Sequence, residues 1–222
     1  LSNATFDANL GVCYVGWAGE VSGTGELDLR NARMANGTLT ANDLQVGRSA
    51  YSPSQGYIKV GPASGLTNLT VLTNLKIGGG GGTLGRIGDP DNGYRLPAGV
   101  NVTLGTWGVT RCNVTLGEHT YAWVGPAAGR LAPSAGGGCT AYLGTVEIAA
   151  DSSVEPATDA RNALGTLDLT NMTSITADIQ TLRLANSTFQ KGKGYVYLPA
   201  GNVTVKDVLV CAAGLTNATY VD

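Results

Sequence analysis

The stretch Gly25-Glu26-Leu27-Asp28-Leu29 decides the fold class, because apolar and polar side chains alternate along it. Asn101-Val102-Thr103-Leu104-Gly105 alternates in the same way, and a period of two is typical of a strand with one buried face. Leu, Val, Ile and Thr dominate such runs, while Gly, Asn, Pro and Ala separate them. Helical periodicity is nearly absent. The sequence therefore predicts an all-β protein.

Similar short runs recur in the same order along the chain. Leu27-Asp28-Leu29 matches Leu167-Asp168-Leu169, and Leu44-Gln45-Val46 matches Leu182-Arg183-Leu184. The separation between matched positions drifts, which indicates short insertions in loops. We therefore predict a single module over residues 1–222, with diverged internal repeats at about 23–82, 83–150 and 165–214.

A longer motif supports the same interpretation. Tyr57-x-x-Val60-Gly61-Pro62-Ala63-x-Gly65 recurs as Tyr121-x-x-Val124-Gly125-Pro126-Ala127-x-Gly129, and looser Gly-Tyr copies begin at Gly93 and Gly194. Many short strands in drifting repeats favour a parallel β-solenoid, or β-helix, with irregular loops. A β-sandwich is the alternative. Its strands would be joined by clear hairpin turns, and Asp91-Asn92-Gly93 is the one strong candidate for such a turn.

The most specific chemical signal is the N-glycosylation acceptor pattern, Asn-x-Thr. It occurs nine times, whereas random placement of the 15 Asn and 25 Thr predicts about two. In a strand the Asn and Thr share one face, so they point outward while the residues between and after them point inward. The alternative is that Asn and Thr serve only in solenoid turns and ladders. We expect glycans on the outer wall, at Asn3, Asn36, Asn68, Asn101, Asn113, Asn171, Asn186, Asn202 and Asn217.

Four cysteines, Cys13, Cys112, Cys139 and Cys211, suit two disulfides in an oxidising compartment. No Cys-x-x-Cys pair is present, and with a single histidine, His119, a zinc site is a poor interpretation. Three pairings are open, and we predict Cys112–Cys139 with Cys13–Cys211. Cys13 and Cys211 are also candidates for a link between neighbouring copies. The alternative is that the cysteines are buried free thiols.

Both ends of the chain carry one hexapeptide pattern. It occurs as Leu1-Ser2-Asn3-Ala4-Thr5-Phe6 and as Leu215-Thr216-Asn217-Ala218-Thr219-Tyr220, with a related copy at 184–189. Either the hexapeptide marks a recurring coil, or the chain is one period of a longer tandem array. A solenoid has an open strand edge at each tip, and both ends here carry strand-like apolar residues instead of a polar cap. We therefore expect copies to stack end to end into a fibre.

Composition argues against several other functions. Charged residues make up 14% and the net charge is −2, without a basic block, so nucleic acid and anionic membranes are poor partners. No run approaches the ~20 apolar residues of a membrane span. The acids are scattered, and the closest pair, Asp89 and Asp91, fits a turn. We therefore expect no enzymatic activity, no metal and no cofactor.

The chain resembles extracellular β-helical repeat proteins, such as adhesin-like surface proteins and tandem-repeat, glycan-coated fibre proteins. The resemblance is carried by the Tyr-x-x-Val-Gly-Pro-Ala-x-Gly copies, the Leu-Asp-Leu copies and the Asn-x-Thr series. It implies a structural role at the cell surface or in a secreted fibre. The expected function is that of a heavily N-glycosylated extracellular module that assembles end to end into a fibre or surface layer. The alternative is a discrete carbohydrate-binding or adhesive β-domain, and an enzyme acting on polysaccharides is the third interpretation.

Overall fold

The computed structural model describes residues 8–34, 37–49, 52–80, 82–120, 126–150, 163–186 and 192–210. Within these residues the chain has fourteen strands and two short 3-10 helices, η1 (Pro62–Ser64) and η2 (Pro90–Asn92). No helix in this part of the chain has the length and hydropathy needed to cross a membrane. The strands are β1 (Ala8–Ala18), β2 (Gly23–Asp28), β3 (Thr38–Ser49), β4 (Ser54–Lys59), β5 (Asn68–Gly79), β6 (Thr83–Gly88), β7 (Asn101–Leu104), β8 (Cys112–Glu118), β9 (Ala127–Leu131), β10 (Gly138–Ile148), β11 (Ala163–Asp168), β12 (Ser174–Leu184), β13 (Gly192–Tyr197) and β14 (Asn202–Val210).

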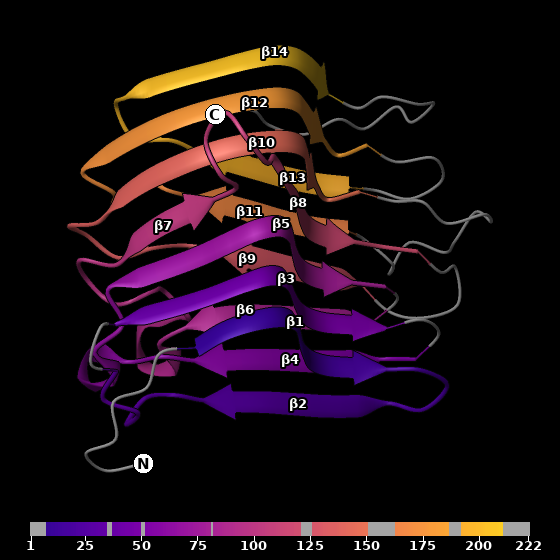
Figure 1. Cartoon of the computed structure of the whole chain (residues 1–222). Coiled ribbons are helices and arrows are strands. Elements are labelled where there is room, and N and C mark those ends of the chain that lie inside the picture. The colour runs from indigo at the N-terminus through magenta and orange to yellow at the C-terminus, as the bar shows by residue number, and fades with distance from the viewer. Residues whose placement is uncertain are drawn as a thin grey trace.

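The strands form two parallel sheets. An eight-stranded sheet has the order β1-β3-β5-β7-β10-β12-β14, with β8 pairing β5 and β10, and a six-stranded sheet has the order β2-β4-β6-β9-β11-β13. The chain passes from one sheet to the other and back, so that each passage adds one coil to a stack (Figure 1). Every ladder between the described strands is parallel. The protein is therefore a parallel β-solenoid, and the β-sandwich alternative is wrong.

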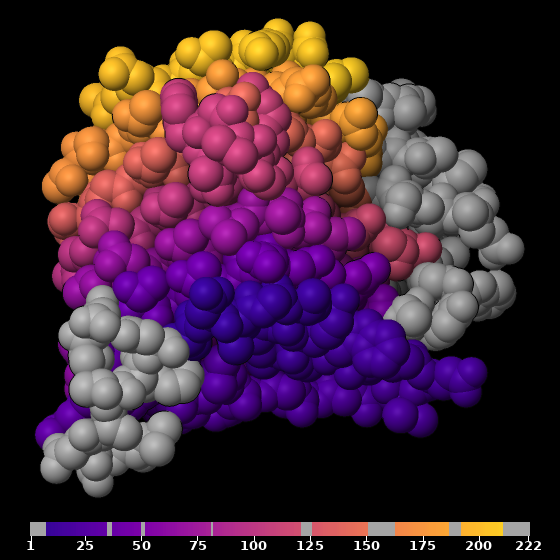
Figure 2. Space-filling model, in the orientation of Figure 1, coloured from indigo at the N-terminus to yellow at the C-terminus, as the bar shows by residue number. Residues whose placement is uncertain are grey.

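The chain advances along one axis, coil by coil. Figure 2 shows the colours in bands from indigo to yellow, so the order in sequence is also the order in space. Gly16, Gly47 and Gly78 occupy equivalent places in the first three coils and are 31 residues apart. Each of the three repeats predicted from the sequence spans about two coils.

The core lies between the sheets and consists of columns of apolar side chains. One column runs through five coils in register, and none of its members is more than 2% exposed: Val46, Ile77, Leu116, Ile148 and Leu184. Leu44 and Leu182, which the sequence matches, share a second column. Each fully buried side chain of this size contributes about 1.5–3 kcal/mol, so these columns stabilise the stack.

Along one edge the two sheets meet backbone to backbone. Six glycines of the six-stranded sheet lie there in register: Gly25, Gly56, Gly85, Gly129, Gly165 and Gly194. We call this column the glycine seam. A Cβ on Gly85 would lie 2.3 Å from the Val46 carbonyl oxygen and 2.4 Å from the Gly78 nitrogen, so the seam admits no side chain. The facing residues of the eight-stranded sheet turn with positive φ and are Gly16, Gly47, Gly78, Gly117, Ala149 and Ala185.

The fourth coil carries an insertion between β7 and β8, at residues 105–111. Trp107 packs on Tyr142 of β10, with ring centroids 5.6 Å apart, and Arg111 forms an ion pair with Asp178 of β12 at 3.0 Å. Figure 2 shows this insertion as a magenta patch over the coils that follow. The insertion leaves β8 in register with β5 and β10, so the stack continues through it.

The nine-residue motif of the sequence does not mark equivalent places in the fold. Gly65 follows η1 with a φ of 70°, whereas Gly129 lies within β9 and belongs to the glycine seam. In the same way Gly93 follows η2, whereas Gly194 lies in β13. Residues 121–125 of the second copy lie outside the described residues. The local likeness is therefore separate from the repeat of the coils.

Candidate functional site

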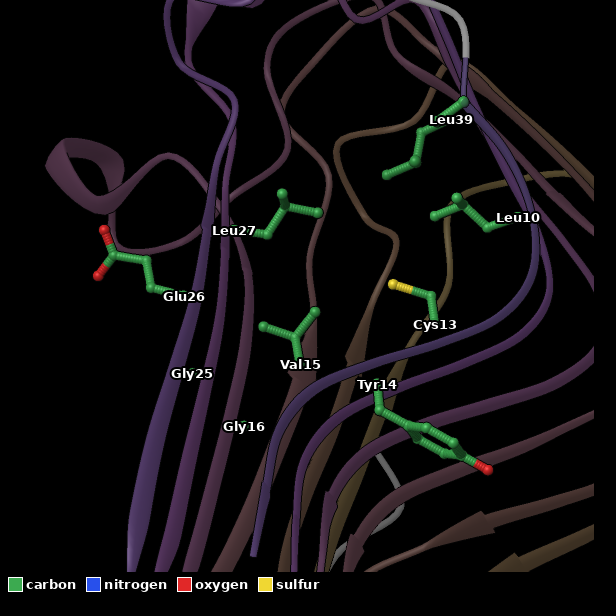
Figure 3. Close-up of a pocket in the computed structure, with 10 residues that line it drawn as sticks. Leu10, Cys13, Tyr14, Val15, Gly16, Gly25, Glu26, Leu27 and Leu39 are labelled. Carbon is green, nitrogen blue, oxygen red and sulfur yellow. The ribbon is translucent and has the colours of Figure 1, made fainter.

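The N-terminal tip of the stack is an open end of the core. A depression of about 460 Å³ lies between the first strands of the two sheets. Figure 3 shows the side chains of Leu10, Cys13, Val15, Leu27 and Leu39 turned toward this space. In the following coils the equivalent apolar side chains fill the core. At this tip they face an unfilled space.

The strands around the depression are sheet edges. Among the described strands β1 pairs with β3 alone and β2 pairs with β4 alone, so each has one unpaired backbone edge. The first of these strands, β1, exposes large apolar side chains, including Val12, Tyr14 and Trp17, the last 59% exposed. Exposed apolar edge strands are the usual templates for pairing with another chain, and natural monomers cover or charge them.

The opposite tip has matching features. β14 pairs with β12 alone among the described strands, so its far edge is also unpaired. Val208 and Val210 lie opposite Leu182 and Leu184, which places them on the core side of the sheet. They are nevertheless 58% and 43% exposed, whereas Leu184 is 2% exposed. Within the described residues, the core is therefore open at both tips.

The described acceptor asparagines lie on the outer wall or at its corners. Asn101, Asn113, Asn171 and Asn202 are exposed, and Asn68 and Asn186 are half-buried. Asn3, Asn36 and Asn217 lie outside the described residues. The residues that the alternation places inward are buried in the β5, β7 and β8 copies, and they are Leu69, Val71, Val102, Leu104, Val114 and Leu116.

Two of these asparagines form hydrogen bonds with residues of the adjacent coils. Asn101 donates its Nδ2 to Asn68 Oδ1 at 3.3 Å and accepts the Gly138 amide at 3.0 Å. Asn113 donates Nδ2 to Asn74 Oδ1 at 3.5 Å. An asparagine Nδ2 carries two hydrogens, so one can serve the ladder while a glycan would replace the other. The ladder alternative and glycosylation are therefore chemically compatible.

The cysteines correct one prediction. Cys112 and Cys139 are buried free thiols, so the predicted Cys112–Cys139 bridge is wrong. Cys112 lies opposite Leu143, four residues along β10 from Cys139, which is about 13 Å and beyond the reach of a disulfide. Burial raises the pKa of both thiols to about 12, so they stay protonated and unreactive at neutral pH.

The other predicted pair stays a prediction. Cys13 is a half-buried thiol in β1. Cys211 lies outside the described residues, so the Cys13–Cys211 pairing is not placed by the structure.

The outer face of the six-stranded sheet carries a cluster that the sequence did not indicate. Arg86 of β6 lies in register between Tyr57 of β4 and Arg130 of β9. Tyr94, from the excursion that follows β6, packs on Tyr57 with ring centroids 5.6 Å apart. These residues are distant in sequence. The sequence signal that could have grouped Tyr57, Arg86 and Arg130 is that each directly follows a glycine of the seam.

Asp168 is the buried acid at the border of this cluster. Its Oδ2 accepts hydrogen bonds from Arg95 at 2.8 Å and Arg130 at 3.4 Å, and its Oδ1 accepts from the Thr170 hydroxyl at 2.7 Å. Burial alone would raise the pKa of Asp168, but the hydrogen bonds from Thr170 and Arg95 outweigh it and lower the pKa. Asp168 is therefore ionised at neutral pH and shared between two arginines.

Other described acids form structural ion pairs or cap turns. Glu26 pairs with Lys59 at 2.5 Å, and Asp28 with Arg30 at 2.6 Å, where the hydrogen bond from Arg30 lowers the pKa of Asp28 to about 2. The carboxylate of Asp89 accepts the Asp91 amide at 3.1 Å and so caps η2, as a turn requires. Within the described ranges no three His, Cys, Asp or Glu side chains gather closely enough to hold a metal ion.

Comparisons with known proteins give no further assignment. No protein-family model matches the chain, and neither the curated proteins nor the solved structures contain a match.

Proposed function

We propose that this protein is a structural β-solenoid unit that stacks end to end with copies of itself, as separate chains or as successive repeats of one chain. The observation that carries the proposal is the open apolar core at the N-terminal tip, with its depression of about 460 Å³. Closing that depression with another coil would bury the exposed apolar surface at about 25 cal/mol per Å². It would also pair the free edge of β1.

The register of the strands supports a continuous stack. Val15 of β1 and Val210 of β14 belong to one column, which runs through the same positions of every coil between them. A copy placed in register would therefore set Val210 of one unit beside Val15 of the next, in the same column. The two tips differ, so the contact is heterologous and does not close on itself, which yields a filament.

The proposed contact is held by backbone pairing and apolar burial. Cys211 lies outside the described residues, so a link between copies through Cys13 and Cys211 stays a prediction.

The outer wall is proposed to carry N-glycans, which places the protein outside the cell, at the surface or in a secreted fibre. The exposure of Asn101, Asn113 and Asn202 supports this, because an acceptor must be reachable. Mass spectrometry of protein from its natural source, before and after enzymatic deglycosylation, is the test. Unmodified asparagine at most of the nine positions would contradict it.

Stacking is tested by electron microscopy and size-exclusion chromatography of the purified protein. Seven strand levels at about 4.8 Å predict an axial repeat of about 34 Å. Leu27→Lys places a charge in the open depression and should abolish filaments, and Val208→Lys, at an exposed position, should do the same from the other tip. Leu164→Lys, on the outer face of the same sheet as Leu27, is the matched control and should assemble normally.

Wild-type protein that remains as isolated particles at all concentrations would refute stacking, as would unchanged assembly of both tip variants. Isolated particles would instead favour the alternative function, a discrete carbohydrate-binding domain, for which the tyrosine and arginine cluster on the six-stranded sheet is the supporting observation. The proposal includes no enzymatic role, and turnover of a polysaccharide by the pure protein would contradict it.

A further inference from the structure

Arg86 is a half-buried cation, and no carboxylate among the described residues balances its charge. Among the described residues, Arg30, Arg95, Arg111, Arg130 and Arg183 each have a carboxylate within ion-pair distance. The charged neighbour of Arg86 is another guanidinium, that of Arg130, and no carboxylate in the described part of the chain pairs with it. Burial, and then repulsion from Arg130, lower the pKa of Arg86.

The charge around Arg86 is positive overall. Arg95 and Arg130 share the single carboxylate of Asp168, at 2.8 Å and 3.4 Å. Three guanidinium groups on this face are thus set against one buried acid. A guanidinium presents two parallel N–H donors to a carboxylate or sulfate, so this deficit of negative charge suits an anionic group.

Two tyrosines lie next to Arg86 on the same face of the sheet. Tyr57 precedes Arg86 in the outward column, and its ring is fixed by a hydrogen bond from its hydroxyl to Gln55 Oε1 at 2.7 Å. Tyr94 packs on Tyr57 at a tilt of 31°. Tyr94 holds a φ of 57°, a conformation that costs a non-glycine residue about 1–2 kcal/mol and is often retained at binding sites.

We propose that Arg86, Arg130, Tyr57 and Tyr94 form a binding site for an acidic saccharide, a pyranose that carries a carboxylate or a sulfate. The anionic group binds the unbalanced guanidinium of Arg86, with Arg130 beside it. The apolar face of the sugar ring packs against the tyrosine pair. The site lies on the outer face of the six-stranded sheet and does not depend on stacking at the tips.

The test is isothermal titration calorimetry of the intact protein with four probes at low salt. The probes are an oligogalacturonide, a sulfated dextran oligosaccharide, a neutral dextran oligosaccharide of equal length, and inorganic sulfate. We expect the acidic saccharides to bind at least about tenfold more tightly than the neutral one and than sulfate alone, because charge-assisted hydrogen bonds and ring packing add. Preference for one acidic probe identifies whether the carboxylate or the sulfate is the natural group.

Arg86→Gln should weaken binding of the acidic probe at least about tenfold. Arg183→Gln, a half-exposed arginine of the other sheet, is the matched control and should bind like the wild type. Tyr94→Ser should lose the advantage of the saccharide over sulfate while sulfate still binds. Because Arg86 is repelled by Arg130, Arg86→Gln should unfold in urea at the same concentration as the wild type or higher.

Three results would overturn the inference. They are no binding of either acidic saccharide, equal binding of the neutral one, and an Arg86→Gln variant that binds as tightly as the wild type. If sulfate alone binds as tightly as the saccharides, the saccharide assignment is wrong and the site is a simple anion site.

Discussion

Replacing Gly85 by alanine tests the glycine seam that joins the two sheets. The φ of Gly85 lies outside the left-handed region, so the cost is purely steric. The added Cβ would lie 2.3 Å from the Val46 carbonyl oxygen, 2.4 Å from the Gly78 nitrogen and 2.7 Å from Ile77 Cγ2. Real Cβ atoms essentially never come within 3.0 Å of such neighbours, so the sheets must separate by about 0.7 Å.

The expected loss of stability is about 3 kcal/mol, the upper end of the range for an overfilled core. The upper end applies because the closest atoms belong to the backbone. Val46 and Gly78 are held by the ladders of β3 and β5 and cannot rotate away as a side chain can. For a chain of this length the same loss lowers the Tm by about 6–12 °C.

The measurement is urea unfolding followed by circular dichroism. Gly11→Ala is the matched control, because Gly11 also lies within a strand but no heavy atom lies within 4 Å of the position that an added Cβ would take there. That change should stay within about 0.5 kcal/mol. A Gly85→Ala variant as stable as the control would refute the close approach of the sheets and the reasoning built on it.

Three further outcomes follow from single sites. Ala185→Gly should stabilise the protein by up to about 1 kcal/mol in urea unfolding, because the residue has a φ of 50° that glycine adopts without strain; a lower midpoint would contradict this. The free energy of unfolding should fall as the pH rises from about 9 toward 12. In that range the thiols ionise in the unfolded chain, whereas Cys112 and Cys139 stay protonated in the folded protein. The Cys112→Ala/Cys139→Ala variant should show a smaller fall. Asp168→Asn should cost about 1–3 kcal/mol at pH 7, since Arg95 loses its buried acceptor. That cost should shrink as the pH drops below 3.8, the ordinary pKa of the carboxyl group, and then below the lowered pKa of Asp168 in the folded protein, because the wild-type Asp168 then loses its charge as well. A cost that does not depend on pH would argue against the ion pair.

Side-chain alternation predicted the strands, and their recurrence in drifting repeats predicted the solenoid. The match of Leu44 with Leu182 was informative because both residues fill one core column, where only an apolar side chain fits. The outward placement of Asn101 beside the buried Val102 and Leu104 follows from the same period of two. The alternation is local, and a single strand is enough to show it.

Contacts between coils were not predictable in the same way. Tyr57 and Arg86 meet only because the coil between them has a particular length, and the separation of seam glycines varies from 29 to 44 residues. The cysteine pairing failed for this reason, since nothing local sets Cys112 opposite Leu143 instead of Cys139. The glycines looked like loop residues, although a Gly-x-Leu, Gly-x-Ile or Gly-x-Val pattern marks all six places of the seam.

The parallel ladders have a mechanical consequence. Because β1 and β14 lie at opposite ends of the stack, a force that pulls the chain by its ends acts along the hydrogen bonds between coils. Such bonds break one after another, like a zipper, instead of all at once in shear. A coil occupies about 4.8 Å of the stack but extends to about 100 Å of chain when it is released. Under tension the molecule therefore yields gradually and absorbs work.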